Sequence, residues 1–223
     1  MYKLIILILF LSSASIADEK RLSIAVDTPQ YVQRSEHKSL NYNSRVRFLV
    51  IHYTSSNWQR SLELLTLPEY QVSTHYLIPE SFDETYHEQD LAVYQLVDEN
   101  DRAWHAGKSK WEDRENINDQ SIGIELVNNS ACYYQDDNES LDFTDDYMCS
   151  FRDYDPKQIQ LLIALSKQIL SRHLEITPTR VIGHADVQSG VKSDPGPKFP
   201  WFTLHQHGIG AWYDHETVSK YWL

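Results

Sequence analysis

The sequence lacks a cluster of lysine and arginine residues. It carries 20 of these residues against 32 acidic ones, which gives a formal net charge of −12 at pH 7. Because binding to nucleic-acid phosphates is driven by gathered positive charge, we expect no nucleic-acid partner. No internal repeat is evident, and 223 residues with 41% hydrophobic composition are enough for one globular domain with its own core.

Long hydrophobic runs are scarce as well. The apolar run at the N-terminus, Leu4–Leu11, is far shorter than the roughly 20 residues that span a bilayer, so we expect no transmembrane anchor. Lys3 before this run and the small residues up to Ala17 are typical of a cleaved signal peptide over residues 1–17. The protein is therefore expected to be exported, either to the periplasm or out of the cell.

Only two cysteines occur, Cys132 and Cys149. In an exported protein such a pair is expected to form a disulfide, although two unpaired thiols are the alternative. The segment around them, at about 129–153, is rich in Asp, Asn, Ser and Tyr. We interpret it as a surface insertion rather than as part of the core.

The hydrophobic pattern predicts an α/β domain over residues 45–223, which follows a polar, aperiodic arm over 18–44. β-branched and apolar residues predict strands at 46–53, 72–78, 92–97, 121–127 and 180–184. Capping residues and helical spacing predict a short helix at 58–67 and a longer one that starts at Asp155–Pro156 and ends before Pro178. We expect a mixed central β-sheet flanked by helices.

Ten histidines are present, and most must be ordinary surface or core residues. Two differ in context, because His52 and His184 each end a predicted strand, and Asp194 follows in the next loop. Two imidazoles and one carboxylate leave the fourth tetrahedral position of Zn²⁺ open, as a catalytic zinc site requires. The set therefore predicts a zinc site in a groove at strand ends, although spacing alone leaves other sets open.

Four motifs strengthen this prediction. Ile51–Thr54, Ile122–Glu125, Gly183–Asp186 and Lys192–Gly196 resemble, in this order, the motifs of the type 2 N-acetylmuramoyl-L-alanine amidases, relatives of the peptidoglycan recognition proteins and of certain phage amidases. Further matches are Val72–Ile78, Trp104–Gly107 and Gly208–Trp212. The resemblance runs from about Val46 to the C-terminus, and its most specific part is Gly-His-x-Asp followed by Lys-x-Asp-Pro-Gly.

The resemblance implies a role for each matching residue: His52, His184 and Asp194 as zinc ligands, Glu125 as the catalytic carboxylate and Lys192 as the catalytic lysine. It also implies hydrolysis of the amide bond between N-acetylmuramic acid and L-alanine, in peptidoglycan or its muropeptide fragments. Glu125 is expected to take a proton from water and return it to the leaving amine, while Lys192 stabilises the oxyanion. We expect the enzyme to be a monomer.

Three residues in the shared motifs, His75, Trp104 and His105, are candidates for substrate contact. Each has an ordinary alternative, since histidine and tryptophan more often pack in a core. Asp186 is a candidate partner for the second ring nitrogen of His184, or else a surface residue.

Three other functions remain open at this point. The first is a peptidoglycan-binding protein without catalysis, although binding alone would not require Glu125 and Lys192. The second is another zinc peptidase of the cell wall, but the sequence has no His-Glu-x-x-His helix. The third is a lysin aimed at foreign walls. The insertion lies near the expected cleft and would affect access or substrate choice, and we expect no wall-binding module after Trp212.

Overall fold

The computed structural model describes residues 32–134 and 147–220. The predicted signal peptide, the first part of the predicted arm and the centre of the insertion lie outside these ranges and stay predictions. The chain divides into two units, Met1–Asn41 and Tyr42–Leu223. Residues 32–41 of the first unit are exposed and form no helix or strand. Everything below concerns the second unit.

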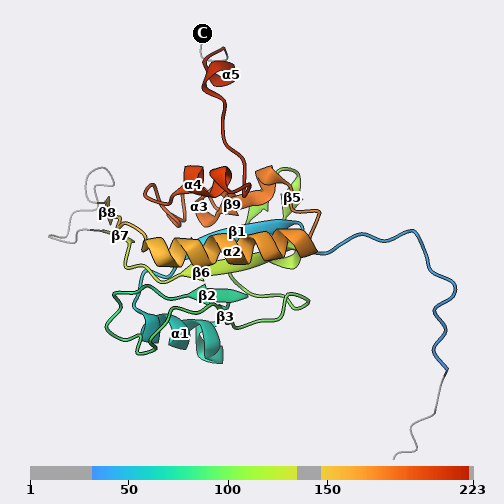
Figure 1. The fold of residues 1–223 in the computed structure, drawn as a ribbon, viewed down its shortest axis with the longest axis horizontal. Helices are drawn as coiled ribbons and strands as arrows, with labels where there is room; N and C mark the ends of the chain where they lie inside the picture. The colour runs from blue at the N-terminus through green and yellow to red at the C-terminus, as the bar shows by residue number, and fades with distance from the viewer. Residues whose placement is uncertain (1–31, 135–146, 221–223) are drawn as a thin grey trace, which may run out of the picture. The chain divides into compact units, whose positions relative to one another are not determined.

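A five-stranded mixed sheet forms the centre of this unit, in the order β3-β2-β6-β1-β9 (Figure 1). Its strands are β1 (Phe48–Tyr53), β2 (Tyr76–Ile78), β3 (Tyr94–Gln95), β6 (Ser121–Leu126) and β9 (Val181–Gly183). β1 pairs in parallel with both β6 and β9, β2 pairs in parallel with β6, and β3 runs antiparallel to β2. The predicted mixed sheet is confirmed.

All five of these strands are shorter than the sequence predicts, and two of them differ by four residues. In the predicted strand 72–78 only Tyr76–Ile78 joins the sheet, because Ser73 bonds the loop at Trp104 instead. The Ser73 amide donates to the Trp104 carbonyl at 3.2 Å, and the Trp104 amide donates to Ser73 Oγ at 2.9 Å. In the predicted strand 92–97 the amides of Leu96 and Val97 converge on the His75 carbonyl, which ends the ladder after Gln95.

Five α-helices occur in the described ranges: α1 (Trp58–Thr66), α2 (Pro156–Arg172), α3 (His184–Val187), α4 (Trp201–Gln206) and α5 (His215–Ser219). The first two were predicted, and their caps explain where they start. Asn57 Oδ1 accepts from the Arg60 amide, and Asp155 Oδ1 accepts from the Lys157 amide. Figure 1 shows α2 lying across the sheet, α1 beside β2 and β3, and α3 beside β9. None of the helices within the described residues is long and apolar enough to cross a membrane.

The remaining elements are short. Three 3₁₀ turns cover Pro68–Tyr70, Ile117–Gln120 and Pro178–Arg180. Two hairpins pair β4 (Lys110–Trp111) with β5 (Arg114–Glu115) and β7 (Ala131–Tyr134) with β8 (Tyr147–Ser150). The second hairpin lies within the predicted insertion, and a Cys132–Cys149 disulfide joins its strands. The predicted disulfide is therefore confirmed.

The two faces of the sheet are packed differently. On one face, Ile122, Ile124 and Leu126 of β6 are fully buried in the cluster that α2 covers. Because side chains alternate along a strand, Ser121, Gly123 and Glu125 lie on the opposite face. There β1 contributes Phe48, Val50 and His52, and only the first two belong to a hydrophobic cluster. The polar residues of the two strands thus share one face.

Candidate active site

The candidate ligands lie where three parallel strands end. His52 is the penultimate residue of β1, and it pairs in register with Glu125 of β6. His184 follows directly after β9 and opens α3. In parallel sheets the carboxyl ends of the strands meet at one edge, which is the usual place for a ligand site. Sheet topology therefore brings together residues that are far apart in the sequence.

Asp194 is held against this edge by the backbone of its own loop. Its carbonyl accepts a hydrogen bond from the Ala185 amide at 2.8 Å. The close approach also needs Gly183, because a Cβ at that position would lie 2.5 Å from Pro195 Cδ. A glycine before His184 thus lets the Asp194 loop lie directly on the end of β9.

His52, His184 and Asp194 form one buried cluster. Asp194 Oδ2 lies 2.9 Å from His52 Nδ1 and 3.1 Å from His184 Nδ1. Each of the three residues offers a ligand atom within 4.8 Å of the other two, and none is more than 7% exposed. Two imidazoles and one carboxylate are the donor set of catalytic zinc sites, and their convergence on one point fits such an ion.

The surroundings shift the pKa values of His52 and Asp194. Burial lowers the pKa of His52, although the hydrogen bond to Asp194 opposes this effect. Burial acts to raise the pKa of Asp194, but the hydrogen bonds from His184 and His52 outweigh it and hold the pKa well below its usual range. Neutral imidazole and ionised carboxylate are the forms in which these side chains bind metals.

Glu125 lies beside the cluster, in register with His52. Its Oε2 atom is buried and makes no hydrogen bond within the described residues. Burial raises its pKa well above the usual value, the charge of Asp194 adds to this rise, and Lys192 counteracts it. Buried polar atoms are rarely left unpaired, so such an atom points to a missing ligand or to a functional role.

A cavity of about 430 Å³ opens in front of these groups. Its walls come from four parts of the unit: the end of β1 with α1, the 72–73 and 104–105 segments, the β7 strand, and the 191–194 loop. The lining residues used below are Trp104, Glu125, Cys132, His184, Lys192 and Asp194. The predicted ligands and the two predicted catalytic residues therefore converge on one concave site, except that His52 lies beneath its surface.

Comparison with known proteins identifies the family of the chain. The sequence pattern of the N-acetylmuramoyl-L-alanine amidases matches residues 42–197. The chain belongs to this family. It is 42% identical over 177 residues to the N-acetylmuramoyl-L-alanine amidase AmiD of Escherichia coli strain K12, covering 79% of this chain and 58% of AmiD. It therefore spans less than two thirds of that relative.

Solved structures of family members have the same fold. AmpDh3 from Pseudomonas aeruginosa, crystallised in complex with an anhydromuramic pentapeptide, matches with 43% identity and a TM-score of 0.75, over 87% of this chain and 72% of that one. The complex of Escherichia coli AmiD with anhydro-N-acetylmuramic acid-L-Ala-D-γ-Glu-L-Lys matches with 39% identity and a TM-score of 0.68, over 83% and 66%.

The three residues proposed from the family motifs for substrate contact have different surroundings. Trp104 is 51% exposed and lines the cavity, as substrate contact requires. His75 is fully buried, and its Nδ1 accepts from the Gly123 amide at 3.0 Å. Burial lowers the pKa of His75 to about 4, so it is a neutral core residue at pH 7.

His105 is the third of these residues. It reaches the cavity wall but is only 7% exposed, and both ring nitrogens lie within hydrogen-bond distance of protein atoms. Burial, reinforced by the neighbouring imidazoles of His52, His75 and His184, holds its pKa well below the usual value. Its surroundings favour a supporting role within the family site over direct contact with substrate.

Asp186 does not bond the His184 ring, which was one of its two expected roles. Its Oδ2 accepts from the Gly183 amide at 2.7 Å and so caps the start of α3. His184 Nε2 is buried without a partner within the described residues. Asp186 therefore stabilises the turn that presents His184 rather than the imidazole itself.

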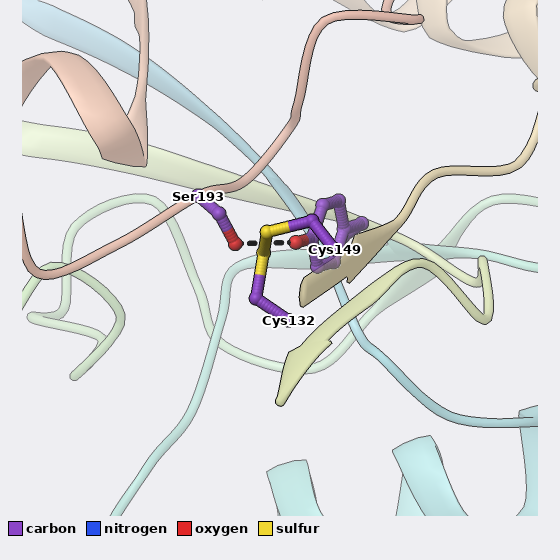
Figure 2. The surroundings of a disulfide bond; sticks show 4 residues. Cys132, Cys149 and Ser193 are labelled. Atoms are coloured by element: carbon purple, nitrogen blue, oxygen red, sulfur yellow. Dashed lines mark hydrogen bonds between the residues drawn. A yellow bond between two sulfur atoms is a disulfide. The ribbon is translucent and has the colours of Figure 1, made fainter. Parts of the chain in front are cut away.

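Two further residues that line the cavity were not predicted. Tyr53 and Ser193 share a hydrogen bond of 2.6 Å between their hydroxyl groups, which ties the end of β1 to the loop between Lys192 and Asp194. Figure 2 shows Ser193 beside the Cys132–Cys149 disulfide, and Cys132 and Ser193 line the same cavity. Tyr53 lies within the first family motif and Ser193 within the last, so the motifs themselves were the available signal.

Proposed function

We propose that this protein hydrolyses the amide bond between N-acetylmuramic acid and L-alanine in peptidoglycan or its muropeptide fragments, with zinc held by His52, His184 and Asp194. The observation that carries the proposal is the approach of both imidazole Nδ1 atoms to Asp194 Oδ2, at 2.9 and 3.1 Å. Beside them lies the buried Oε2 atom of Glu125, which makes no hydrogen bond within the described residues. A protein that only binds peptidoglycan would need the cavity but not a buried His52–His184–Asp194 cluster beside Glu125. Family membership supports the choice of bond.

Glu125 would carry the protons of the reaction. When bound, zinc activates water and polarises the scissile carbonyl. Glu125 then accepts a proton from the attacking water and returns it to the amide nitrogen, because an unprotonated amine leaves poorly. Burial raises the pKa of this carboxyl group and so favours the protonated form, which must exist between the two steps.

Lys192 would stabilise the oxygen that becomes negative as water adds to the carbonyl. It lies two residues before Asp194 and lines the same cavity. One donor aimed at a developing oxyanion contributes about 3 to 4 kcal/mol in comparable sites. Trp104 would cover the substrate from the opposite segment, with its exposed ring against a sugar or the stem peptide.

We also propose that the protein acts outside the cytoplasm as a monomer, in the periplasm or after secretion. The disulfide supports this compartment, because such bonds persist in oxidising surroundings. The residues expected to carry the export signal lie outside the described ranges.

Mass spectrometry of purified muropeptides, incubated with and without a chelator, tests the proposal. Release of a stem peptide that begins with L-alanine, abolished by chelation and restored by zinc, is the expected result. Release of single stem amino acids would assign the protein to the peptidases instead, and retention of substrate without cleavage would make it a binding protein. Parallel reactions on intact and anhydro-muramyl substrates would show which form is preferred.

The Glu125→Gln variant tests the assigned proton carrier. It keeps the size of the side chain and removes its basicity, so we expect turnover to fall by about 10²- to 10⁴-fold. Zinc content should stay at one ion per protein, because Glu125 is not a ligand. Near-normal turnover with zinc bound would remove Glu125 from the mechanism.

A further inference from the structure

The ring of His52 is bonded at both ends. Its Nδ1 faces Asp194 Oδ2, while its Nε2 lies 3.0 Å from His105 Nδ1. The other nitrogen of His105, Nε2, lies 3.1 Å from Ser121 Oγ. These contacts form one buried series, the His52–His105–Ser121 relay, in which no member is more than 7% exposed.

The surroundings of His105 keep its ring in this position. Gly123 of β6 leaves room for it, because a Cβ there would lie 2.6 Å from His105 Cγ. Asn118 Oδ1 accepts from the amides of both His105 and Ala106, at 3.1 and 2.7 Å, and so fixes the backbone. Gly123 and Asn118, together with the hydrogen-bond partners His52 and Ser121, thus position the His105 ring behind a candidate ligand.

The hydrogen bonds of the relay can run in either of two directions, depending on which ring nitrogens carry the protons. An ionised Asp194 only accepts hydrogen bonds, so a bond from His52 Nδ1 needs the proton on Nδ1. In a neutral ring His52 Nε2 must then accept from His105 Nδ1–H, and His105 Nε2 must accept from the Ser121 hydroxyl. If Nδ1 instead gives its lone pair to a metal, the proton must lie on Nε2, and each bond in the series reverses.

Ser121 makes this reversal possible. A hydroxyl donates or accepts equally well, whereas a carboxylate or a carbonyl at the end of the relay would permit only one direction. Each imidazole keeps one proton in both arrangements, so the change needs no net uptake or release of protons. Both arrangements satisfy every buried nitrogen of the relay, which avoids the 1 to 3 kcal/mol that an unpaired buried group typically costs.

We propose that His105 is a positioning residue which, together with Ser121, sets the tautomer of His52 and allows it to switch when zinc binds. The proposal rests on the zinc site of the proposed function. Ligating histidines usually donate their second N–H to a carboxylate, a carbonyl or water. Here a second histidine takes that place, and its own tautomer follows that of the ligand.

Nitrogen-15 NMR of the histidine side chains tests the switch in the unmodified protein. In protein stripped by a chelator we expect His52 and His105 to carry their protons on Nδ1. On addition of one equivalent of zinc, both should change to Nε2–H. A His105 tautomer that stays constant while zinc binds would overturn the proposal. If zinc does not bind at all, the proposed function fails first, so the two failures are distinguishable.

Substitutions at His105 test the effect on metal affinity. His105→Asn keeps an acceptor near the position of Nδ1, whereas His105→Leu removes it. We expect zinc affinity, measured by competition with a chromophoric chelator, to fall by about 10- to 100-fold in His105→Leu and by only a few-fold in His105→Asn. Ser121→Ala should have a smaller effect of the same kind, because it removes only the far end of the relay.

His75→Asn is the matched control. His75 is also a buried histidine, its ring centroid is 5.8 Å from that of His105, and neither of its nitrogens bonds a candidate ligand. Its substitution should reduce stability while zinc affinity stays near that of the unmodified protein. Equal affinities in His105→Leu and His75→Asn would reduce His105 to a packing residue. Should His105→Leu fail to fold, the comparison of His105→Asn with Ser121→Ala and the NMR measurement still decide the question.

Discussion

The floor and the walls of the cavity are built in different ways. The floor consists of buried side chains at the ends of β1, β6 and β9, and the Asp194 carboxylate joins His52 to His184. The walls carry exposed or partly exposed groups such as Trp104 and the β7–β8 hairpin, which is held by a local disulfide. We therefore expect the chemistry to depend on the sheet and the choice of substrate to depend on the wall segments.

Removal of a floor ligand should have the largest effect. In Asp194→Ala we expect zinc to be lost and turnover to fall by at least about 10³-fold, since a catalytic metal contributes several kcal/mol and 1.36 kcal/mol is a tenfold change. Metal analysis and turnover of a muropeptide measure the two effects. Asp186→Asn is the control, because that carboxylate bonds only the start of α3 in the described structure. An Asp194→Ala protein that retains zinc would contradict the assigned ligand set.

Lys192 lies where the floor meets the wall. We expect Lys192→Ala to lower kcat by about 10²- to 10³-fold, since one oxyanion donor is removed, with little change in KM. Steady-state kinetics separates the two constants. Lys198→Ala serves for comparison, because Lys198 pairs with Asp153 at 3.1 Å and does not line the cavity. A rise in KM with unchanged kcat would show that Lys192 binds substrate and does not take part in catalysis.

The disulfide tests the wall. The bond joins cysteines 17 residues apart, and we expect the Cys132→Ser, Cys149→Ser double variant to lose about 3 kcal/mol of unfolding free energy. Because Cys132 lines the cavity, KM should rise as well, while zinc affinity stays unchanged. Denaturant unfolding and chelator competition measure these quantities. A parallel loss of zinc affinity would show that the hairpin supports the floor too.

Glu99 does not line the cavity, and its substitution tests what stabilises the fold away from the site. Burial acts to raise its pKa, but hydrogen bonds from Arg172, Tyr76 and His173 outweigh it and lower the pKa to about 2. A lowered pKa stabilises the fold above the unfolded value of about 4.3 and loses this effect as pH falls towards 2. We expect Glu99→Gln to cost about 2 kcal/mol at pH 7 and less at pH 3.

The matched substitution for this measurement is Glu112→Gln. Glu112 pairs with Arg180 at 2.9 Å, but its side chain is 35% exposed, against 13% for Glu99. Exposed pairs contribute at most about 1 kcal/mol. Unfolding by denaturant at pH 7 and pH 3 gives the comparison, and equal losses for both variants at both pH values would argue against the depressed pKa of Glu99.

The smallest effect on activity is expected from Trp104, an exposed residue of the cavity wall. Trp104→Ala should raise KM by roughly 5- to 10-fold through the loss of about 1 kcal/mol of aromatic contact, with kcat nearly constant. Phe202→Ala is the control, since Phe202 is 48% exposed, compared with 51% for Trp104, and does not line the cavity. Unchanged KM in both variants would leave Trp104 without a role in substrate binding.

The sequence predicted the floor better than the walls, for a physical reason. The candidate ligands His52, His184 and Asp194 sit in motifs with fixed spacing, so they could be grouped before their geometry was known. Strand pairing depends on segments that are far apart in the sequence, so a local pattern does not show where a strand joins the sheet. The predicted strand 72–78 therefore gave no sign that Ser73 bonds the Trp104 loop, and Asp186 gave no sign that it bonds Gly183 rather than His184.

His105 illustrates the same limit within the site itself. The motif marked it as functional, but its type and spacing could not separate substrate contact from support of a ligand. That distinction depends on which atoms lie 3 Å from its two nitrogens, and these belong to β1 and β6. The disulfide, by contrast, could be predicted because compartment and cysteine count suffice to suggest it.

One strand constrains how this site could be transplanted or evolve. The alternate residues of β6 supply the hydroxyl at Ser121, the room for the His105 ring at Gly123 and the carboxylate at Glu125. A shift of one position along the strand would turn all three into the core and place apolar side chains on the face that carries the site. A designer who grafts this centre onto another scaffold would therefore have to move β6 with its register intact, because no single residue of the series can be transferred alone.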